Sequence, residues 1–257
     1  MKKIIAFDLD GTLAPSKSEV PDRIAELLGE LLEYFHICVI SGGKYEQFEN
    51  QLLSKLKLEE ERLNKLHIMP TCGTRYYLHS SRSKAWEMIY SEDFTDKQKE
   101  KIISTTKSVV HSLGLDNVKV YGEQIEDRGS QISWSALGQD IVDELGEEGV
   151  KQKEAWDPDN SRKEQIRDML APLLPEFEVR TGGTTTIDIT KKGIDKAYGM
   201  KKIAERLNMT KEDILFFGDK LQEGGNDYPV KAMGIDSLEV SDWQDTAFAL
   251  EAMLHIV

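Results

Sequence analysis

Cysteine is scarce in this sequence, and long hydrophobic runs are missing. The 257 residues include two cysteines, Cys38 and Cys72, which are too few for a disulfide framework and lie in no Cys/His metal-binding pattern. There is no run of about 18 apolar residues, the length expected of a membrane-spanning helix. The short apolar run at the N-terminus soon meets acidic residues, so no cleavable signal peptide fits there. We therefore expect a cytoplasmic protein with buried thiols and no membrane partner.

Positive charge is also in short supply. Lys and Arg total 33 against 46 Asp and Glu, which gives a formal net charge of −13. Such a chain lacks the surplus of cations that displaces counterions from nucleic acid, so we expect no nucleic-acid partner. A small anionic substrate is still compatible, because a local cationic pocket can lie in an acidic protein. The 39% of hydrophobic residues is typical of a globular protein with a substantial core.

Apolar runs and amphipathic segments alternate in the first eighty residues and again near the C-terminus. The strand-like runs are KKIIAFDLD, HICVISGG, LHIMPTCGTRYYL and ILFFGDK. The helix-like segments are VPDRIAELLGELLEYF, YEQFENQLLSKL and GIDKAYGMKKIAERL. This alternation predicts an α/β fold with a doubly wound, Rossmann-like parallel sheet.

Between these regions the pattern changes. Long helical stretches, such as EDFTDKQKEKIISTTKSVVHSLGL and DNSRKEQIRDMLAPLL, accompany alternating strand-like runs, VKVYGEQIEDRG, SQISWSALG and TTTIDIT. The acidic run IVDELGEEGV is expected to be a solvated face or loop. We therefore predict an α+β cap domain at 82–186, inserted into a catalytic core made of 1–81 and 187–257.

Acidic and hydroxyl residues follow the predicted strands where these end. Ligands of an open parallel sheet gather outside the carboxyl ends of its strands. Side chains far apart in sequence are therefore expected to meet there. The candidates are Asp8, Asp10, Ser41, Lys196, Asp219 and Asp227.

Clustered carboxylates are costly unless a positive charge joins them. A hard divalent cation with oxygen ligands is the natural candidate, and Mg²⁺ typically combines a few carboxylates with substrate phosphate. The set suits phosphoryl transfer, in which positioning and charge neutralisation supply most of the catalysis. One carboxylate can act as the nucleophile, and a second acid two residues away can move the proton.

The sequence resembles the haloacid dehalogenase superfamily in four motifs. These are DLDGT at 8–12, Ser41 after a buried strand, Lys196, and the acids of GDKLQEGGND. The inserted module resembles the superfamily's type IIB cap, found in Cof-like proteins and sucrose phosphatases. Within the superfamily, FDLDGTLAPS, VISGGKYEQFENQL, GGTTTIDITKKGIDKAYG and FFGDKLQEGGND are most similar to eukaryotic-type phosphomannomutases.

The resemblance implies a role for each matching residue of the core. Asp8 is expected to be the nucleophile and Asp10 the general acid/base. Ser41 and Lys196 are expected to bind the transferring phosphoryl group, with Gly42 beside it. The implied ligands of Mg²⁺ are Asp8, the Asp10 carbonyl and Asp219, supported by Asn226 and Asp227.

In the cap, the resemblance implies that Arg128, Thr186 and Asp188 bind the substrate. The mutase pattern has an arginine where this chain has Gln139, and a second arginine has no counterpart in DIVDELGEEGV. A mutase must hold phosphate at both ends of a sugar, so these losses remove charge-assisted bonds. We therefore expect a Mg²⁺-dependent phosphatase of a small phosphorylated metabolite, with a sugar-phosphate mutase as the alternative. The protein is expected to be a monomer or a homodimer formed through the cap.

Simpler structural roles remain open for each of these residues. Asp227 can cap a helix, Ser41 can form a turn, and Arg128 can pair with Asp127 in a hairpin. Other classes also compete: a calcium-binding loop, a receiver-like signalling domain and a catalytically inactive scaffold. A calcium loop that starts at Asp8 would need glycine where Leu13 stands.

Overall fold

The computed structural model describes residues 2–116 and 118–256. They form two compact units. The first combines the chain up to Ser91 with the chain from Ile194 onward, and the second is Glu92–Gly193.

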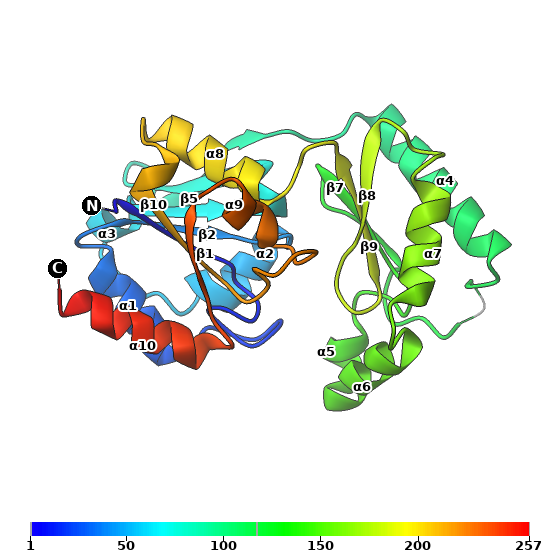
Figure 1. Cartoon of the computed structure of the whole chain (residues 1–257), viewed down its shortest axis with the longest axis horizontal. Coiled ribbons are helices and arrows are strands. Elements are labelled where there is room, and N and C mark those ends of the chain that lie inside the picture. Colours follow the sequence, from blue (N-terminus) through cyan, green and yellow to red (C-terminus); the bar gives the residue numbers. More distant parts are fainter. Residues whose placement is uncertain (1, 117, 257) are drawn as a thin grey trace. The chain divides into compact units, whose positions relative to one another are not determined.

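The first unit contains a seven-stranded sheet in the order β11-β10-β1-β2-β3-β4-β5 (Figure 1). Its first five strands pair in parallel, and β4 and β5 add an antiparallel hairpin at one edge. The parallel strands are β1 (Ile4–Phe7), β2 (His36–Ile40), β3 (Leu66–Met69), β10 (Ile214–Gly218) and β11 (Asp236–Glu239). The hairpin strands are β4 (Arg75–Ser80) and β5 (Ala85–Ser91). The predicted α/β core with a parallel sheet is confirmed.

Helices cover both faces of this sheet. Alternate residues of β1 face opposite sides: Ile5 and Phe7 pack into one hydrophobic cluster, and Ile4 and Ala6 into another. The first cluster includes residues of α1 (Asp22–Leu31) and α10 (Trp243–Leu254), and the second includes residues of α8 (Lys196–Arg206) and α9 (Tyr228–Ala232) (Figure 1). Burial on both faces explains why these strands read as continuous apolar runs.

Short helical segments complete the first unit. They are α2 (Tyr45–Phe48), the π-helical η1 (Glu49–Leu53), α3 (Glu60–Leu63), and the 3₁₀ turns η2 (Thr71–Gly73) and η3 (Lys211–Asp213). Among the described residues of the whole chain, no helix combines the length and apolar character needed to cross a membrane.

The second unit is an antiparallel sheet with helices on one face (Figure 1). The sheet order is β6-β7-β9-β8, with β6 (Ile125–Asp127), β7 (Gln131–Ser135), β8 (Phe177–Thr181) and β9 (Thr186–Lys191). Ile132, Trp134, Ile187 and Ile189 pack against α4 (Asp96–Ser112) and α7 (Ser161–Leu170). The alternate residues of the same strands form a polar face on the other side.

The observed units differ from the expected ones at both boundaries. The expected cap began at 82, but β5 pairs with β4 over Arg75–Ser91 and so belongs to the seven-stranded sheet. The expected core resumed at 187, but β9 pairs with both β7 and β8 in the four-stranded sheet. Sheet pairing therefore places each boundary several residues further along the chain.

Two expectations within the second unit agree with the structure only in part. The acidic run expected to be a solvated face or loop forms α5 (Ile141–Leu145) and the start of α6 (Glu147–Trp156), and its acidic residues are exposed, so it is a solvated helical face and not a loop. Ile141 is completely buried and anchors this pair of helices, while Gly146, at φ +57°, separates them. The predicted strand VKVYGEQIEDRG is a strand only at Ile125–Asp127.

Candidate functional site

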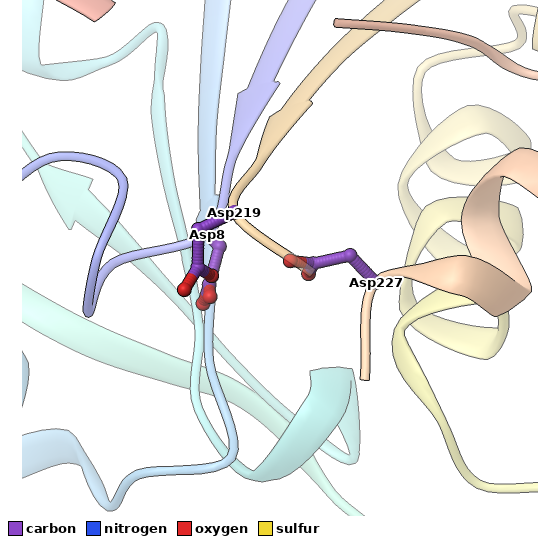
Figure 2. A group of neighbouring side chains, drawn as sticks. All are labelled: Asp8, Asp219 and Asp227. Carbon is purple, nitrogen blue, oxygen red and sulfur yellow. The ribbon is translucent and has the colours of Figure 1, made fainter. Parts of the chain in front are cut away.

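Two neighbouring strands of the seven-stranded sheet end in aspartates. Phe7 of β1 lies opposite Phe217 of β10, so the chain after each strand emerges at the same edge of the sheet. The carboxylate oxygens of Asp8, Asp219 and Asp227 offer ligand atoms that all lie within 4.8 Å of one another. Figure 2 shows Asp8 and Asp219 side by side, with Asp227 pointing toward them from the start of α9. The structure thus brings three of the expected metal ligands together.

Lys196 is a buried cation of this cluster. It is the first residue of α8, whose N-terminus is capped by Asp195 through a hydrogen bond from the Tyr198 backbone N–H. Its Nζ lies 2.7 Å from Asp8 Oδ1 and 2.5 Å from Asp227 Oδ1. All three side chains are nearly inaccessible to solvent. The ammonium group therefore joins the nucleophile candidate to a second buried carboxylate.

The electrostatics follow from burial and from this pairing. Burial raises the pKa of Asp8 to about 7, against the opposing effect of the adjacent Lys196. Burial also raises the pKa of Asp219. For Lys196, burial favours the neutral form, but the neighbouring Asp8 and Asp227 carboxylates outweigh it and raise the pKa above its ordinary value. Lys196 pairs with Asp8 and Asp227, and Lys220 Nζ lies 3.8 Å from Asp219 Oδ2. Two lysines against three carboxylates leave the cluster an excess of negative charge.

The cluster fits a divalent cation. Asp219 Oδ1 is buried and accepts no hydrogen bond from any described residue, although such a bond would normally be required of a buried oxygen. Gly11, at φ +85°, leaves room for the same carboxylate, because a Cβ there would lie 2.5 Å from Asp219 Oδ2. Hard oxygen donors in a cluster of excess negative charge suit Mg²⁺.

Asp10 is held apart from the three clustered carboxylates. Its Oδ2 accepts a hydrogen bond from Gln47 Nε2 at 2.7 Å. Its Oδ1 accepts bonds from the Lys17 backbone N–H at 2.8 Å and from Gln51 Nε2 at 3.2 Å. Sequence reasoning missed both glutamines. The available signal was their four-residue spacing on the helical segment that follows Ser41-Gly42-Gly43.

Ser41 and Gly42 lie at the same edge of the sheet. Val39 of β2 lies opposite Phe7 of β1, so Ser41 leaves the sheet one strand away from Asp8. The buried Ser41 hydroxyl accepts a hydrogen bond of 3.2 Å from the Gly43 backbone N–H. A Cβ at Gly42 would meet no described atom within 4 Å, which makes the backbone there approachable.

The remaining expected metal residues differ from each other in burial. Asp227 is completely buried, and its Oδ2 accepts a hydrogen bond from the Lys220 backbone N–H at 3.1 Å. The neighbouring Asn226 is exposed. Asp227 therefore stabilises both Lys196 and the loop after β10, whereas Asn226 is accessible to solvent.

The expected cap residues lie on the sheet of the second unit. A register row crosses that sheet from Glu126 through Ser133 and Asp188 to Arg180. The Ser133 hydroxyl donates to Asp188 Oδ1 at 2.6 Å.

Arg128 and Thr186 lie close to this row. Arg128 Nε donates to Glu126 Oε2 at 2.7 Å, and Thr186 begins β9 opposite Ser135. Arg128, Thr186 and Asp188 thus form part of one polar region of the second unit.

Comparison with known proteins identifies the class. The chain belongs to the haloacid dehalogenase-like hydrolase family, whose model matches residues 5–229. It is 27% identical to a phosphomannomutase of Encephalitozoon cuniculi over 238 residues, covering 89% of this chain and 84% of the relative. It is 25% identical to a phosphomannomutase of Arabidopsis thaliana, covering 88% and 86%. The expected family and the likeness to phosphomannomutases are confirmed.

Solved structures share the fold at lower identity. An IMP-bound, N-terminally truncated IMP-nucleotidase of Plasmodium falciparum matches with a TM-score of 0.68 at 17% identity, covering 99% of this chain and 68% of that chain. A haloacid dehalogenase-like hydrolase of Bacteroides thetaiotaomicron matches with a TM-score of 0.64 at 17% identity, covering 98% and 100%. Both matches extend over the first and second units together.

Proposed function

We propose that this protein is a Mg²⁺-dependent phosphohydrolase that works through an aspartyl-phosphate on Asp8. The observation that carries the proposal is the contact of Lys196 with Asp8 at the edge of the sheet, beside Asp219. A lysine in this place orients the Asp8 carboxylate for attack on phosphorus. Its positive charge also attracts the negatively charged phosphoryl group to that carboxylate. The family and the phosphomannomutase relatives support phosphoryl chemistry, by hydrolysis or by transfer within a sugar phosphate.

The proposed reaction has two steps. Asp8 attacks phosphorus, the bond from phosphorus to the ester oxygen breaks, and Asp10 gives that oxygen a proton. Water then attacks the same phosphorus and passes a proton to Asp10, which breaks the bond to Asp8 and releases inorganic phosphate. Lys196 and the Ser41 hydroxyl bind the phosphoryl oxygens.

Magnesium would be held by Asp8, Asp219 and the Asp10 carbonyl, with Asn226 and Asp227 in support. Bound there, it would neutralise charge on the phosphoryl group. Asp227 also keeps Lys196 charged and in place through the contact of its Oδ1 with Lys196 Nζ.

A mutase is the second candidate, because relatives that match 88–89% of the chain are phosphomannomutases. In that reaction a sugar hydroxyl would take the place of water. Two observations favour hydrolysis. Gln139 stands where the mutase pattern has an arginine, and Arg128 forms an ion pair with Glu126. Both reduce the positive charge offered to a second phosphate.

The proposed substrate is a small phosphorylated metabolite, with a sugar phosphate as the first class to test. The polar region with Arg128, Thr186 and Asp188 would recognise its hydroxyl groups. The acidic net charge of −13 favours such a partner over nucleic acid or a membrane surface. We further propose a cytoplasmic enzyme that is a monomer or a homodimer formed through the second unit.

The test is ³¹P NMR of the full chain with Mg²⁺, mannose 1-phosphate and a trace of hexose 1,6-bisphosphate. Inorganic phosphate as the only new signal supports hydrolysis and justifies a wider screen of sugar phosphates. A mannose 6-phosphate signal would overturn hydrolysis in favour of the mutase. Absence of both signals, followed by no release of phosphate from any ester in a broad panel, would overturn both candidates.

A further inference from the structure

Both oxygens of the Asp10 carboxylate are engaged by hydrogen-bond donors on its own unit. Gln47 donates to Oδ2 at 2.7 Å, the shortest side-chain bond that Asp10 receives among the described residues. The Lys17 backbone N–H and Gln51 Nε2 donate to Oδ1. A carboxylate bonded at both oxygens has one defined orientation, because rotation of its side chain would break bonds at either end.

Among the described residues, Gln51 Nε2 donates to a second acceptor besides Asp10, whereas Gln47 Nε2 donates to Asp10 alone. Gln51 Nε2 also donates to the Ser18 carbonyl oxygen at 2.6 Å, and the Gln51 carbonyl accepts from the Val20 backbone N–H at 2.7 Å. Gln51 therefore ties the loop after β1 to η1 as well as contacting Asp10. Gln47 is the better probe of the orientation of Asp10 itself.

A glycine makes room for the Gln47 amide. A Cβ on Gly43 would lie 1.8 Å from Gln47 Oε1 and 2.7 Å from its Cδ. Gly43 also donates its backbone N–H to Ser41 Oγ. The Gln47 amide thus lies between Asp10 and the loop that carries Ser41, and its place depends on a residue without a side chain.

We propose that Gln47 is a positioning residue that sets the direction of the Asp10 carboxylate for proton transfer. The inference rests on the proposed phosphohydrolase function and adds a residue to it. The amide donates to Oδ2, and the absence of a side chain on Gly43 leaves room for the amide beside the loop that holds Ser41. The orientation of the proton-transfer group is thereby linked to the place where the phosphoryl group binds.

The leaving group distinguishes this role from a structural one. An alkyl phosphate releases a basic alkoxide, which needs a proton from Asp10 as its bond to phosphorus breaks. A 4-nitrophenyl phosphate releases a stable phenolate, which needs little proton transfer. A misdirected Asp10 therefore slows the alkyl ester selectively, while general damage to the site slows both esters. The ratio kcat/KM reports the steps up to transfer onto Asp8 and excludes the later hydrolysis.

The experiment compares Gln47→Met, which removes the donor at similar volume, with Gln47→Glu, which places a like charge against Asp10. Gln152→Met is the matched control, because Gln152 also donates to a carboxylate, Glu148, but on α6 of the second unit. Each variant and the wild type are assayed in Mg²⁺ with 4-nitrophenyl phosphate and with the best alkyl phosphate of the wild type. Urea unfolding checks that the fold is kept.

We expect Gln47→Met to lower kcat/KM for the alkyl ester about 10-fold or more, part of the ~10²–10⁴-fold typical of general acid/base catalysis. The 4-nitrophenyl ester should change less than about threefold, Gln47→Glu should be more severe, and Gln152→Met should match the wild type. In an Asp10→Asn background, Gln47→Met should have no further effect, because the two residues act as a unit.

Equal losses on both esters, no loss on either, or full additivity with Asp10→Asn would overturn the positioning role while leaving the phosphohydrolase intact. A wild type inactive on every ester would overturn both proposals.

Discussion

The ammonium group of Lys196 lies 2.7 Å from the Oδ1 atom of Asp8, and neither side chain is more than 5% exposed. The two residues are 188 positions apart in sequence (196 − 8). Lys196 is the first residue of α8, and Asp8 directly follows β1. This contact connects the stability of the first unit with its proposed chemistry.

Replacement of Lys196 by methionine is predicted to destabilise the fold. The change leaves Asp8 and Asp227 buried without their counter-charge, which typically costs about 3–5 kcal/mol. Burial already raises the pKa of Asp8 to about 7, and removal of Lys196, which opposes that effect, raises this pKa further. The loss in free energy of unfolding should therefore be larger at pH 8 than at pH 5, as measured by urea denaturation. A loss that is independent of pH would contradict this electrostatic account.

Asp8→Asn is predicted to abolish turnover and leave the fold intact. The amide cannot accept a phosphoryl group, but its oxygen can still accept the Leu9 backbone N–H that Asp8 Oδ1 accepts now, at 2.7 Å. Lys196 keeps its contact with Asp227. Phosphate release measures the turnover, and circular dichroism checks that the fold is kept. A wild-type rate in this variant would contradict the role of Asp8 as the nucleophile.

Gly11→Ala is predicted to weaken Mg²⁺ binding. The added Cβ would lie 2.5 Å from Asp219 Oδ2, so the carboxylate must move. Gly193→Ala is the control, since Gly193 also has a positive φ (+77° against +85°) but a Cβ there would meet no described atom within 4 Å.

The readout is the rise in Tm with added Mg²⁺, which reflects a stabilisation of about 2.7 kcal/mol at a hundredfold excess over Kd. The rise should be smaller in Gly11→Ala than in the wild type and in Gly193→Ala. Equal rises in all three proteins would place the metal elsewhere.

The buried His67 is predicted to make the fold sensitive to acid. His67 Nε2 lies 2.9 Å from His36 Nδ1, and His67 Nδ1 lies 2.7 Å from the Tyr76 hydroxyl. Burial, with smaller contributions from His36 and Arg206, lowers the pKa of His67 to about 3. The unfolded chain takes up this proton near pH 6.5, and the folded chain does not. The free energy of unfolding should therefore fall as pH drops from about 6.5 toward 3.

His67→Gln should flatten this dependence between about pH 6.5 and pH 4, in urea denaturation over a pH series. The exposed His255→Gln is the control and should keep the wild-type slope. A slope in His67→Gln equal to that of the wild type would contradict the assignment.

Much of the core could be predicted from the sequence because its signals are local. Strands buried on both faces appear as apolar runs, and the polar residues that follow them mark one edge of the sheet. Asp8 and Asp219 were found in this way, and the structure brings them together. Lys196 was identified because it matches one of the four motifs of the family. Nothing in the sequence near Lys196 indicates its contact with Asp8, which is distant along the chain.

The rest depends on pairing between segments, which a single sequence does not show. Strand β5 was assigned to the cap because it carries mostly exposed residues and resembles the inserted region. Gln47 and Gln51 were missed because a glutamine on a helix is ordinarily a surface residue. Their role becomes visible only when the helix is placed against the loop that carries Asp10.

The most direct test of the central claim is to find the phosphoryl group on the protein. The wild-type chain is mixed with Mg²⁺ and its best phosphate ester, quenched in acid during turnover and analysed by peptide mass spectrometry, with Asp8→Asn as the control. The account predicts one added phosphoryl group on the peptide that contains Asp8, lost on treatment with hydroxylamine and absent from the control. A wild type that turns over while its Asp8 peptide stays unmodified, or that carries the phosphoryl group on another residue, would contradict the account.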